Sequence, residues 1–86
     1  MIISYTARFK KQYQKLPKKI QLQFDERLKL FISNKSDPRL RVHPLSGNFA
    51  GYWSMNISGD LRALYRQDGD DIYIFALLGT LSQLYG

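Results

Sequence analysis

The sequence has no cysteine and only one histidine, His43. Without thiols, disulfides cannot brace the chain and thiolate metal sites cannot form. A single histidine also excludes any mechanism that needs two imidazoles. There is no glycine-rich phosphate loop, no Ser-His-Asp set and no cluster of metal ligands at a suitable spacing. We therefore expect neither a bound metal nor any other cofactor.

Long hydrophobic runs are missing as well. No apolar stretch approaches the roughly 20 residues that cross a bilayer, and residues 1–11 lack the apolar core of a signal peptide. At 86 residues, the chain is long enough for one domain with a modest core, which we place at residues 1–86. These features predict a cytoplasmic protein without a membrane partner.

Acidic residues are scarce, with seven against 13 Lys and Arg residues and a net charge of +6. All basic residues except Arg62 and Arg66 lie within residues 1–43. A one-sided basic surface suggests a polyanionic partner such as RNA, DNA or a ribosome, although lysines that merely solubilise two helices are the alternative. The residues predicted to bind RNA or the ribosome are Lys10, Lys11, Lys15, Lys18, Lys19, Arg39, Arg41 and Arg66.

The first half of the chain has the pattern of one strand and two helices. Residues 1–5 are β-prone, and Thr6 can N-cap a helix whose apolar residues recur at i, i+4 and i+7. Pro17 suits the first turn of a second amphipathic helix, where we expect an i,i+4 ion pair between Asp25 and Lys29. The polar residues 34–38 end this helix.

The second half has the pattern of three strands. Residues 52–57 alternate between apolar and polar side chains, and residues 61–66 follow after a turn at 58–60. A second turn at 68–70 leads to residues 72–78, which are apolar on both faces and predict a buried strand. We predict an α+β domain of order β-α-α-β-β-β, with a two-helix hairpin on one face of a small, mainly antiparallel sheet.

Three residues have chemistry that a site could use. His43 could transfer a proton near neutral pH or simply anchor its loop through a backbone hydrogen bond. Arg62, on an apolar strand, could stabilise charge on a phosphate or form a structural ion pair with Asp60 or another acid. Tyr85 could stack on a base of single-stranded RNA or pack the C-terminal segment onto the domain.

Four short motifs occur in a distinctive order: His-Pro-Leu-Ser-Gly (43–47), Gly-Tyr-Trp-Ser (51–54), Gly-Asp-x-Arg-x-x-Tyr (59–65) and Gly-Thr-x-Ser-x-Leu-Tyr (79–85). Together with the basic helical hairpin, they resemble the RelE/ParE superfamily of type II toxin–antitoxin toxins, most closely its YafQ/RelE-like branch. The resemblance covers nearly the whole chain and implies the RelE-like fold.

The resemblance also implies a function. Toxins of this branch enter the A site of the 30S ribosomal subunit and cut mRNA without a metal, through attack of the RNA 2′-hydroxyl on the adjacent phosphate. The implied partners are the ribosome, mRNA and a cognate antitoxin, with operator DNA contacted only through that antitoxin. The runner-up is a ParE-like inhibitor of DNA gyrase. A third reading is an inactive toxin that only binds its antitoxin.

Carried over by position, the resemblance implies a catalytic set of His43, Asp60, Arg62, position 81 and Tyr85. Leu81 stands where the branch usually has the histidine assigned to proton transfer, and Asn56 stands where some members have another histidine. Leu81 is a detoxifying substitution, a natural variation in a toxin that relies on His43 and Arg62, or a sign of degeneration. We expect the segment that carries it to be the end of the last strand.

Overall fold

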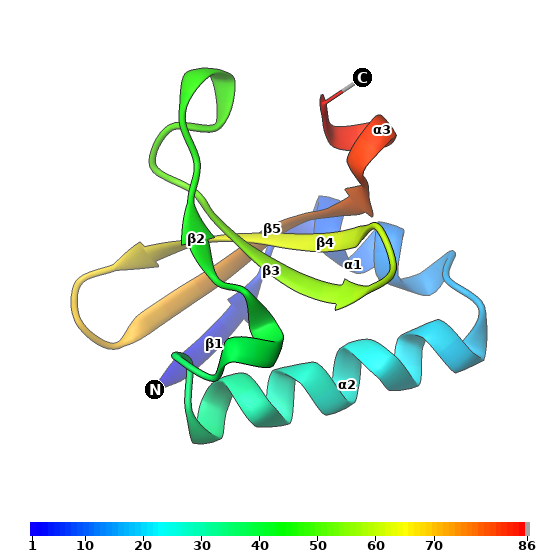
Figure 1. Cartoon of the computed structure of the whole chain (residues 1–86), viewed down its shortest axis with the longest axis horizontal. Coiled ribbons are helices and arrows are strands. Elements are labelled where there is room, and N and C mark those ends of the chain that lie inside the picture. Colours follow the sequence, from blue (N-terminus) through cyan, green and yellow to red (C-terminus); the bar gives the residue numbers. More distant parts are fainter. Residues whose placement is uncertain (86) are drawn as a thin grey trace.

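The computed structural model describes residues 1–85, and its centre is a five-stranded sheet of order β1-β5-β4-β3-β2 (Figure 1). The strands are β1 (Ile2–Tyr5), β2 (His43–Pro44), β3 (Trp53–Ser58), β4 (Leu61–Asp68) and β5 (Ile72–Thr80). The helices are α1 (Ala7–Gln14), α2 (Lys18–Ser33) and α3 (Leu81–Tyr85), with the 3-10 turns η1 (Pro38–Leu40) and η2 (Gly47–Phe49). Only β1 and β5 pair in parallel, so the predicted α+β fold with a mainly antiparallel sheet is confirmed. The predicted order β-α-α-β-β-β, however, lacks the short strand β2 and the short helix α3.

Side-chain hydrogen bonds start α1 and join α2 to it. Thr6 N-caps α1 as predicted, because its Oγ1 accepts a hydrogen bond from the Phe9 amide at 3.1 Å. The predicted Asp25–Lys29 ion pair is wrong. Asp25 is half-buried against α1 and accepts a hydrogen bond from the Tyr13 hydroxyl at 2.9 Å, whereas the exposed Lys29 pairs with Glu26 at 3.6 Å.

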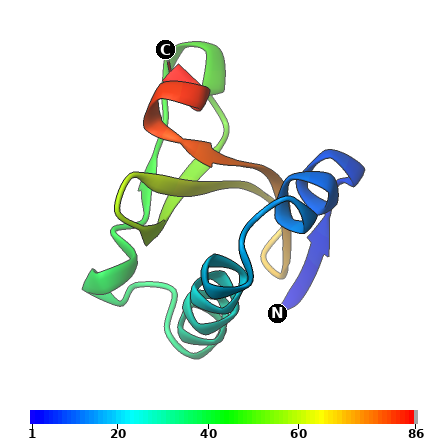
Figure 2. The same ribbon diagram turned by 90° about the vertical axis from the view of Figure 1, so that its right-hand side faces the viewer.

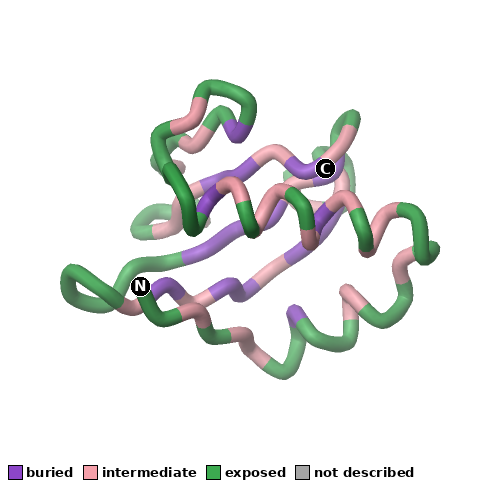
Figure 3. The backbone as a smooth tube through the Cα atoms, turned by 90° about the horizontal axis from the view of Figure 1, so that it is seen from below, coloured by how far each residue is buried: buried purple, intermediate pink, exposed green. Residues whose placement is uncertain are grey.

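The core lies between the sheet and the helices α1 and α2, and it is rich in aromatic rings. Phe9, Phe24 and Phe31 from the helices each place their rings within 6.0 Å of Phe75 on β5. Buried positions are grouped along the strands and occur singly on the helices, as expected for elements with one buried stripe (Figure 3). The aromatic contacts hold both helices on the same face of the sheet, as predicted.

Two bulges interrupt the sheet. In each, the carbonyl of the unpaired residue accepts a hydrogen bond from a side chain outside the sheet. In β5, Ala76 has no partner on β4, and its carbonyl accepts a hydrogen bond from Thr6 Oγ1 at 2.9 Å. In β3, Ile57 is the unpaired residue, and its carbonyl accepts from Arg27 Nε at 3.4 Å. Because bulges re-aim the residues beside them, these bonds fix the direction in which the strand ends point.

The other side of the sheet carries shorter elements. The β2–η2 segment and α3 both rise from the side opposite α2 (Figures 1 and 2). The predicted strand end at residues 81–85 is wrong, because β5 stops at Thr80 and α3 begins. Thr80 and Gln83 form a capping box, in which the Gln83 amide donates to Thr80 Oγ1 at 3.2 Å and the Thr80 amide donates to Gln83 Oε1 at 2.8 Å.

Candidate functional site

A depression of about 350 Å³ lies beside β2 and α3. Both elements rise from the side of the sheet opposite α2 (Figure 1). The residues that line the depression come from β2, β3, β4, α3 and the segments beside β2, and they are Arg41, His43, Leu45, Ser54, Asn56, Arg62, Leu81 and Tyr85. The strand register accounts for this gathering. His43 pairs with Ser54 and Asn56 pairs with Arg62, so these four residues share one face across three strands.

The segment that leads into the depression is held tightly. Asp37 caps η1 by accepting from the Arg39 amide at 2.9 Å, and its other carboxylate oxygen pairs with Arg39 Nη2 at 2.8 Å. These Arg39 hydrogen bonds lower the pKa of Asp37 to about 2. Leu40 at the end of η1 is fully buried, so the turn is held by the Asp37 hydrogen bonds at its start and by core packing at its end. The following residues therefore leave η1 in a defined direction.

Arg41 and His43 are coupled through the backbone. Arg41 adopts a left-handed backbone conformation with φ 48°, which is uncommon for a residue other than glycine. Such strained conformations cluster at functional sites. The His43 Nδ1 lies 2.8 Å from the Arg41 carbonyl oxygen. A carbonyl oxygen only accepts, so Nδ1 is the donor, and in the neutral ring Nε2 keeps its lone pair. The predicted loop anchor is thus present, and it leaves Nε2 free to exchange a proton.

Arg62 lies half-buried beside the β3–β4 turn. Its Nη1 donates to the carbonyl oxygens of Gly59 at 2.8 Å and Leu61 at 3.1 Å. Within residues 1–85, no carboxylate lies within ion-pair distance of this guanidinium, so the alternative of a structural ion pair with Asp60 is wrong. A guanidinium has five N–H donors, and those on Nε and Nη2 make no hydrogen bond to the described residues.

Leu81 and Tyr85 form the wall that α3 contributes. The exposed fractions of Leu81 and Tyr85 are 41% and 49%, so neither residue belongs to the core. The Leu81 amide donates to the Asp60 carbonyl at 3.1 Å, which ties the start of α3 to the β3–β4 turn. The Tyr85 ring meets the Phe49 ring edge to face at 5.6 Å. Tyr85 therefore packs the C-terminal segment and also faces the depression.

The remaining predicted residues lie elsewhere. The Asp60 side chain is exposed and does not line the depression. Of the predicted RNA-binding set, only Arg41 lines it, while Arg39 is engaged with Asp37. The other members are exposed on α1, the α1–α2 connection, α2 and β4; they are Lys10, Lys11, Lys15, Lys18, Lys19 and Arg66. Sequence reasoning missed Ser54 as a lining residue, although it alternates in phase with Asn56.

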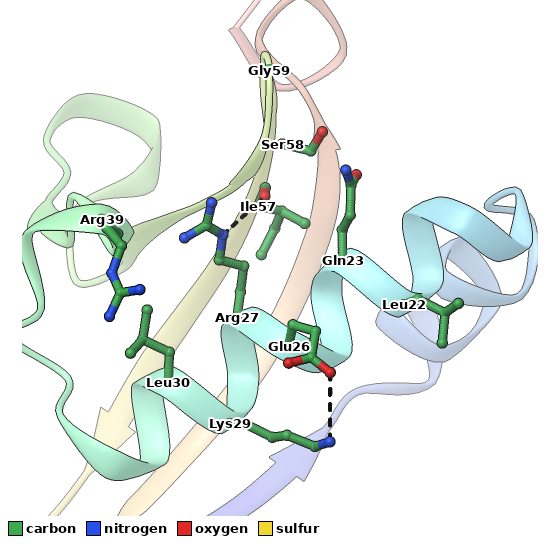
Figure 4. Close-up of a pocket in the computed structure, with 10 residues that line it drawn as sticks. All are labelled: Leu22, Gln23, Glu26, Arg27, Lys29, Leu30, Arg39, Ile57, Ser58 and Gly59. Carbon is green, nitrogen blue, oxygen red and sulfur yellow. Dashed lines mark hydrogen bonds and ion pairs between the residues drawn. The ribbon is translucent and has the colours of Figure 1, made fainter.

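A larger hollow of about 730 Å³ lies between α2, η1 and the end of β3 (Figure 4). Its ionisable groups are mostly engaged, since Arg27 donates to the Ile57 carbonyl and Glu26 pairs with Lys29. Over residues 1–85, no three His, Asp or Glu side chains come together in a way that suits a metal ion. None of the described helices combines the length and the apolar character needed to traverse a bilayer.

The fold and the motifs around this depression define the class of RelE-like toxins. Solved structures that share this fold include three toxins. YafQ from E. coli strain BL21(DE3) has a TM-score of 0.81 and 24% identity, covering 98% of this chain and 97% of that one. A YoeB/ParE toxin from Agrobacterium tumefaciens has a TM-score of 0.77 and 20% identity, covering 93% and 98%. YafQ in the E. coli DinJ–YafQ complex has a TM-score of 0.73 and 23% identity, covering 98% and 97%.

The family comparison is more specific. The model of the family described as bacterial toxin of type II toxin–antitoxin system, YafQ, matches residues 1–86. No curated protein matches the sequence. The chain therefore belongs to the YafQ family of type II toxin–antitoxin toxins.

Proposed function

We propose that this toxin is a ribosome-dependent mRNA endonuclease whose active site is the depression bounded by His43, Arg62 and Tyr85. The observation that carries the proposal is the charge of the lining, which contains the guanidinium groups of Arg41 and Arg62, one imidazole and, among residues 1–85, no carboxylate. Such a lining attracts a phosphodiester and has a group that can move a proton beside it.

The reaction follows from these groups. The RNA 2′-hydroxyl attacks the adjacent phosphorus, and the bond from phosphorus to the 5′-oxygen of the next nucleotide breaks. The products are a 2′,3′-cyclic phosphate and a 5′-hydroxyl. His43 Nε2 takes the proton from the 2′-hydroxyl, and the leaving oxygen takes up a proton. The free N–H donors of Arg62 stabilise the charge that accumulates on the phosphoryl oxygens.

This mechanism also needs an acid that protonates the leaving oxygen. Leu81 occupies the wall where a histidine would do so, and leucine carries no exchangeable proton. The Tyr85 hydroxyl and water are the remaining proton donors on that side. We therefore expect cleavage to be slow, by a factor of roughly 10²–10⁴ against a site with a positioned acid. Asp60 then acts through its backbone, which holds α3, rather than as an acid or base.

The proposed partners are the ribosome with its mRNA and a cognate antitoxin. Solved relatives are complexed with antitoxins, as in the DinJ–YafQ complex. The exposed lysines of α1 and α2 supply a basic surface for ribosomal RNA. Because ribosomes translate mRNA in the cytoplasm, we propose that the toxin acts there. Contact with operator DNA would pass through the antitoxin.

Primer extension on an mRNA that is being translated tests the proposal. We expect cleavage that depends on translation and disappears in His43→Ala and Arg62→Ala, with Glu26→Ala, an exposed acid on α2, as a control on the opposite face. If purified toxin instead inhibits DNA supercoiling by gyrase and leaves mRNA intact, the ParE-like alternative is correct. If it does neither yet binds an antitoxin tightly, the inactive-toxin alternative is correct, for which Leu81 is the motivating observation.

A further inference from the structure

Ser54 is the only polar residue among the buried residues of the chain's described part, with an exposed fraction of 1%. Its Oγ makes no hydrogen bond to any residue in 1–85. A buried hydroxyl without a partner has lost its hydration without compensation, so it costs stability in the free protein. Such atoms in native structures call for an explanation, and a ligand that satisfies them is one.

The position of Ser54 points to that ligand. It lines the depression, and its β3 position lies between His43 on β2 and Leu64 on β4. Asn56 lies two residues further along the same face, next to Arg62. A hydroxyl at this point faces a space that, in the described part of the chain, is bordered by cations and by no carboxylate. The complementary group is an anion that accepts hydrogen bonds.

We propose that Ser54 donates a hydrogen bond to a non-bridging oxygen of the RNA phosphate bound between Arg41, His43 and Arg62. This assignment rests on the proposed function and adds a substrate-binding residue to it. The bond links a neutral donor with a charged acceptor, which makes it stronger than a bond between neutral groups. It also forms only when the substrate is bound, so the stability lost in the free protein is recovered in the complex.

The test combines a protein change with a change in the probe. The probe is a trinucleotide with a 2′-deoxy sugar at the attacking position, which binds without being cut, and its affinity is measured by NMR titration. A second probe replaces the central phosphate by a neutral methylphosphonate. We expect Ser54→Ala to weaken the phosphodiester probe by about tenfold or more and the methylphosphonate probe by about twofold or less. Ser58→Ala, on the same strand but outside the depression, is the matched control.

Thermal unfolding of the free proteins separates binding from folding. Removing an unsatisfied hydroxyl leaves the melting temperature unchanged or raises it. A clear fall would show that Ser54 is bonded within the free protein and would overturn the inference. Equal binding of both probes by Ser54→Ala and the unchanged toxin would overturn it too, while leaving the proposed function intact. If the unchanged toxin binds neither probe and cuts no translated mRNA, the proposed function and this inference fail together.

Discussion

Replacing Leu81 by histidine should restore a proton-transfer group to the α3 wall of the depression. Leu81 is the first residue of α3, and its N–H donates to the Asp60 carbonyl, a bond that any residue except proline can make. At 41% exposure, a new imidazole stays in contact with water and needs no buried partner. The change in helix propensity costs about 0.5 kcal/mol. The variant should therefore fold as the unchanged toxin does.

The gain in rate is far larger than this cost. A positioned general acid contributes roughly 10²–10⁴ in rate, which equals about 3–5 kcal/mol of barrier. Leu81, His43 and Arg62 line the same small depression, so a group at position 81 would lie beside the bound phosphate. The new imidazole would thus face the leaving oxygen while Nε2 of His43 faces the nucleophile. The pH dependence should become bell-shaped, since one imidazole must be neutral and the other protonated.

Cleavage rates on translated mRNA, measured by primer extension at saturating toxin, provide the assay. Leu81→Gln is the control, because it is polar and of similar size but transfers no proton near neutral pH. Leu81→His combined with His43→Ala should lose the gain. Equal rates for Leu81→His and Leu81→Gln would refute the assignment of position 81 as a vacant proton-transfer position.

Three further outcomes follow from the packing and the pKa shifts. Phe31→Ala removes a fully buried ring that meets Tyr65 at 5.1 Å, so calorimetry should show a loss of about 3–5 kcal/mol and a melting temperature lower by on the order of 20 °C. Arg39→Ala should raise the pKa of Asp37 from about 2 toward the usual range, seen by NMR titration of the carboxyl carbon. An unchanged value would contradict the role of that hydrogen-bonded pair. Burial raises the pKa of Tyr65 to about 12, so its neutral form adds stability that is complete below about pH 10 and is lost as pH rises through 12. Tyrosinate absorbance with parallel urea unfolding checks this sign.

Local patterns were sufficient for most of the fold. The alternation along residues 52–57 put Met55 and Ile57 on one face, and both are buried, while Thr6 caps α1 as its position predicted. The failures came where one signal was outweighed by another. Asp25 has a lysine four residues later, yet the Tyr13 hydroxyl on another helix binds it because both are half-buried. Residues 81–85 have the pattern of a continued strand, but Thr80 and Gln83 have the spacing of a capping box, which starts α3 instead.

Some residues of the candidate site could be predicted from the sequence and others could not. His43, Arg62, Leu81 and Tyr85 could be proposed from their residue types and motifs, because their chemistry is a property of each side chain. The exposed position of the Asp60 carboxylate, outside the depression, could not. Neither could Ser54, whose importance comes from being buried without a hydrogen-bond partner.

By itself, the sequence determined the family, the order of the first two helices and of the four longer strands, and the excess of positive charge, since each is encoded in local pattern or composition. It did not predict β2 or α3. Only the tertiary structure decided which residues meet. Strand register aligned His43 with Ser54 and Asn56 with Arg62, and the start of a short helix brought Leu81 to the same depression. The physical reason is that register and long-range hydrogen bonds depend on how the whole core packs, and no stretch of the chain contains that information alone.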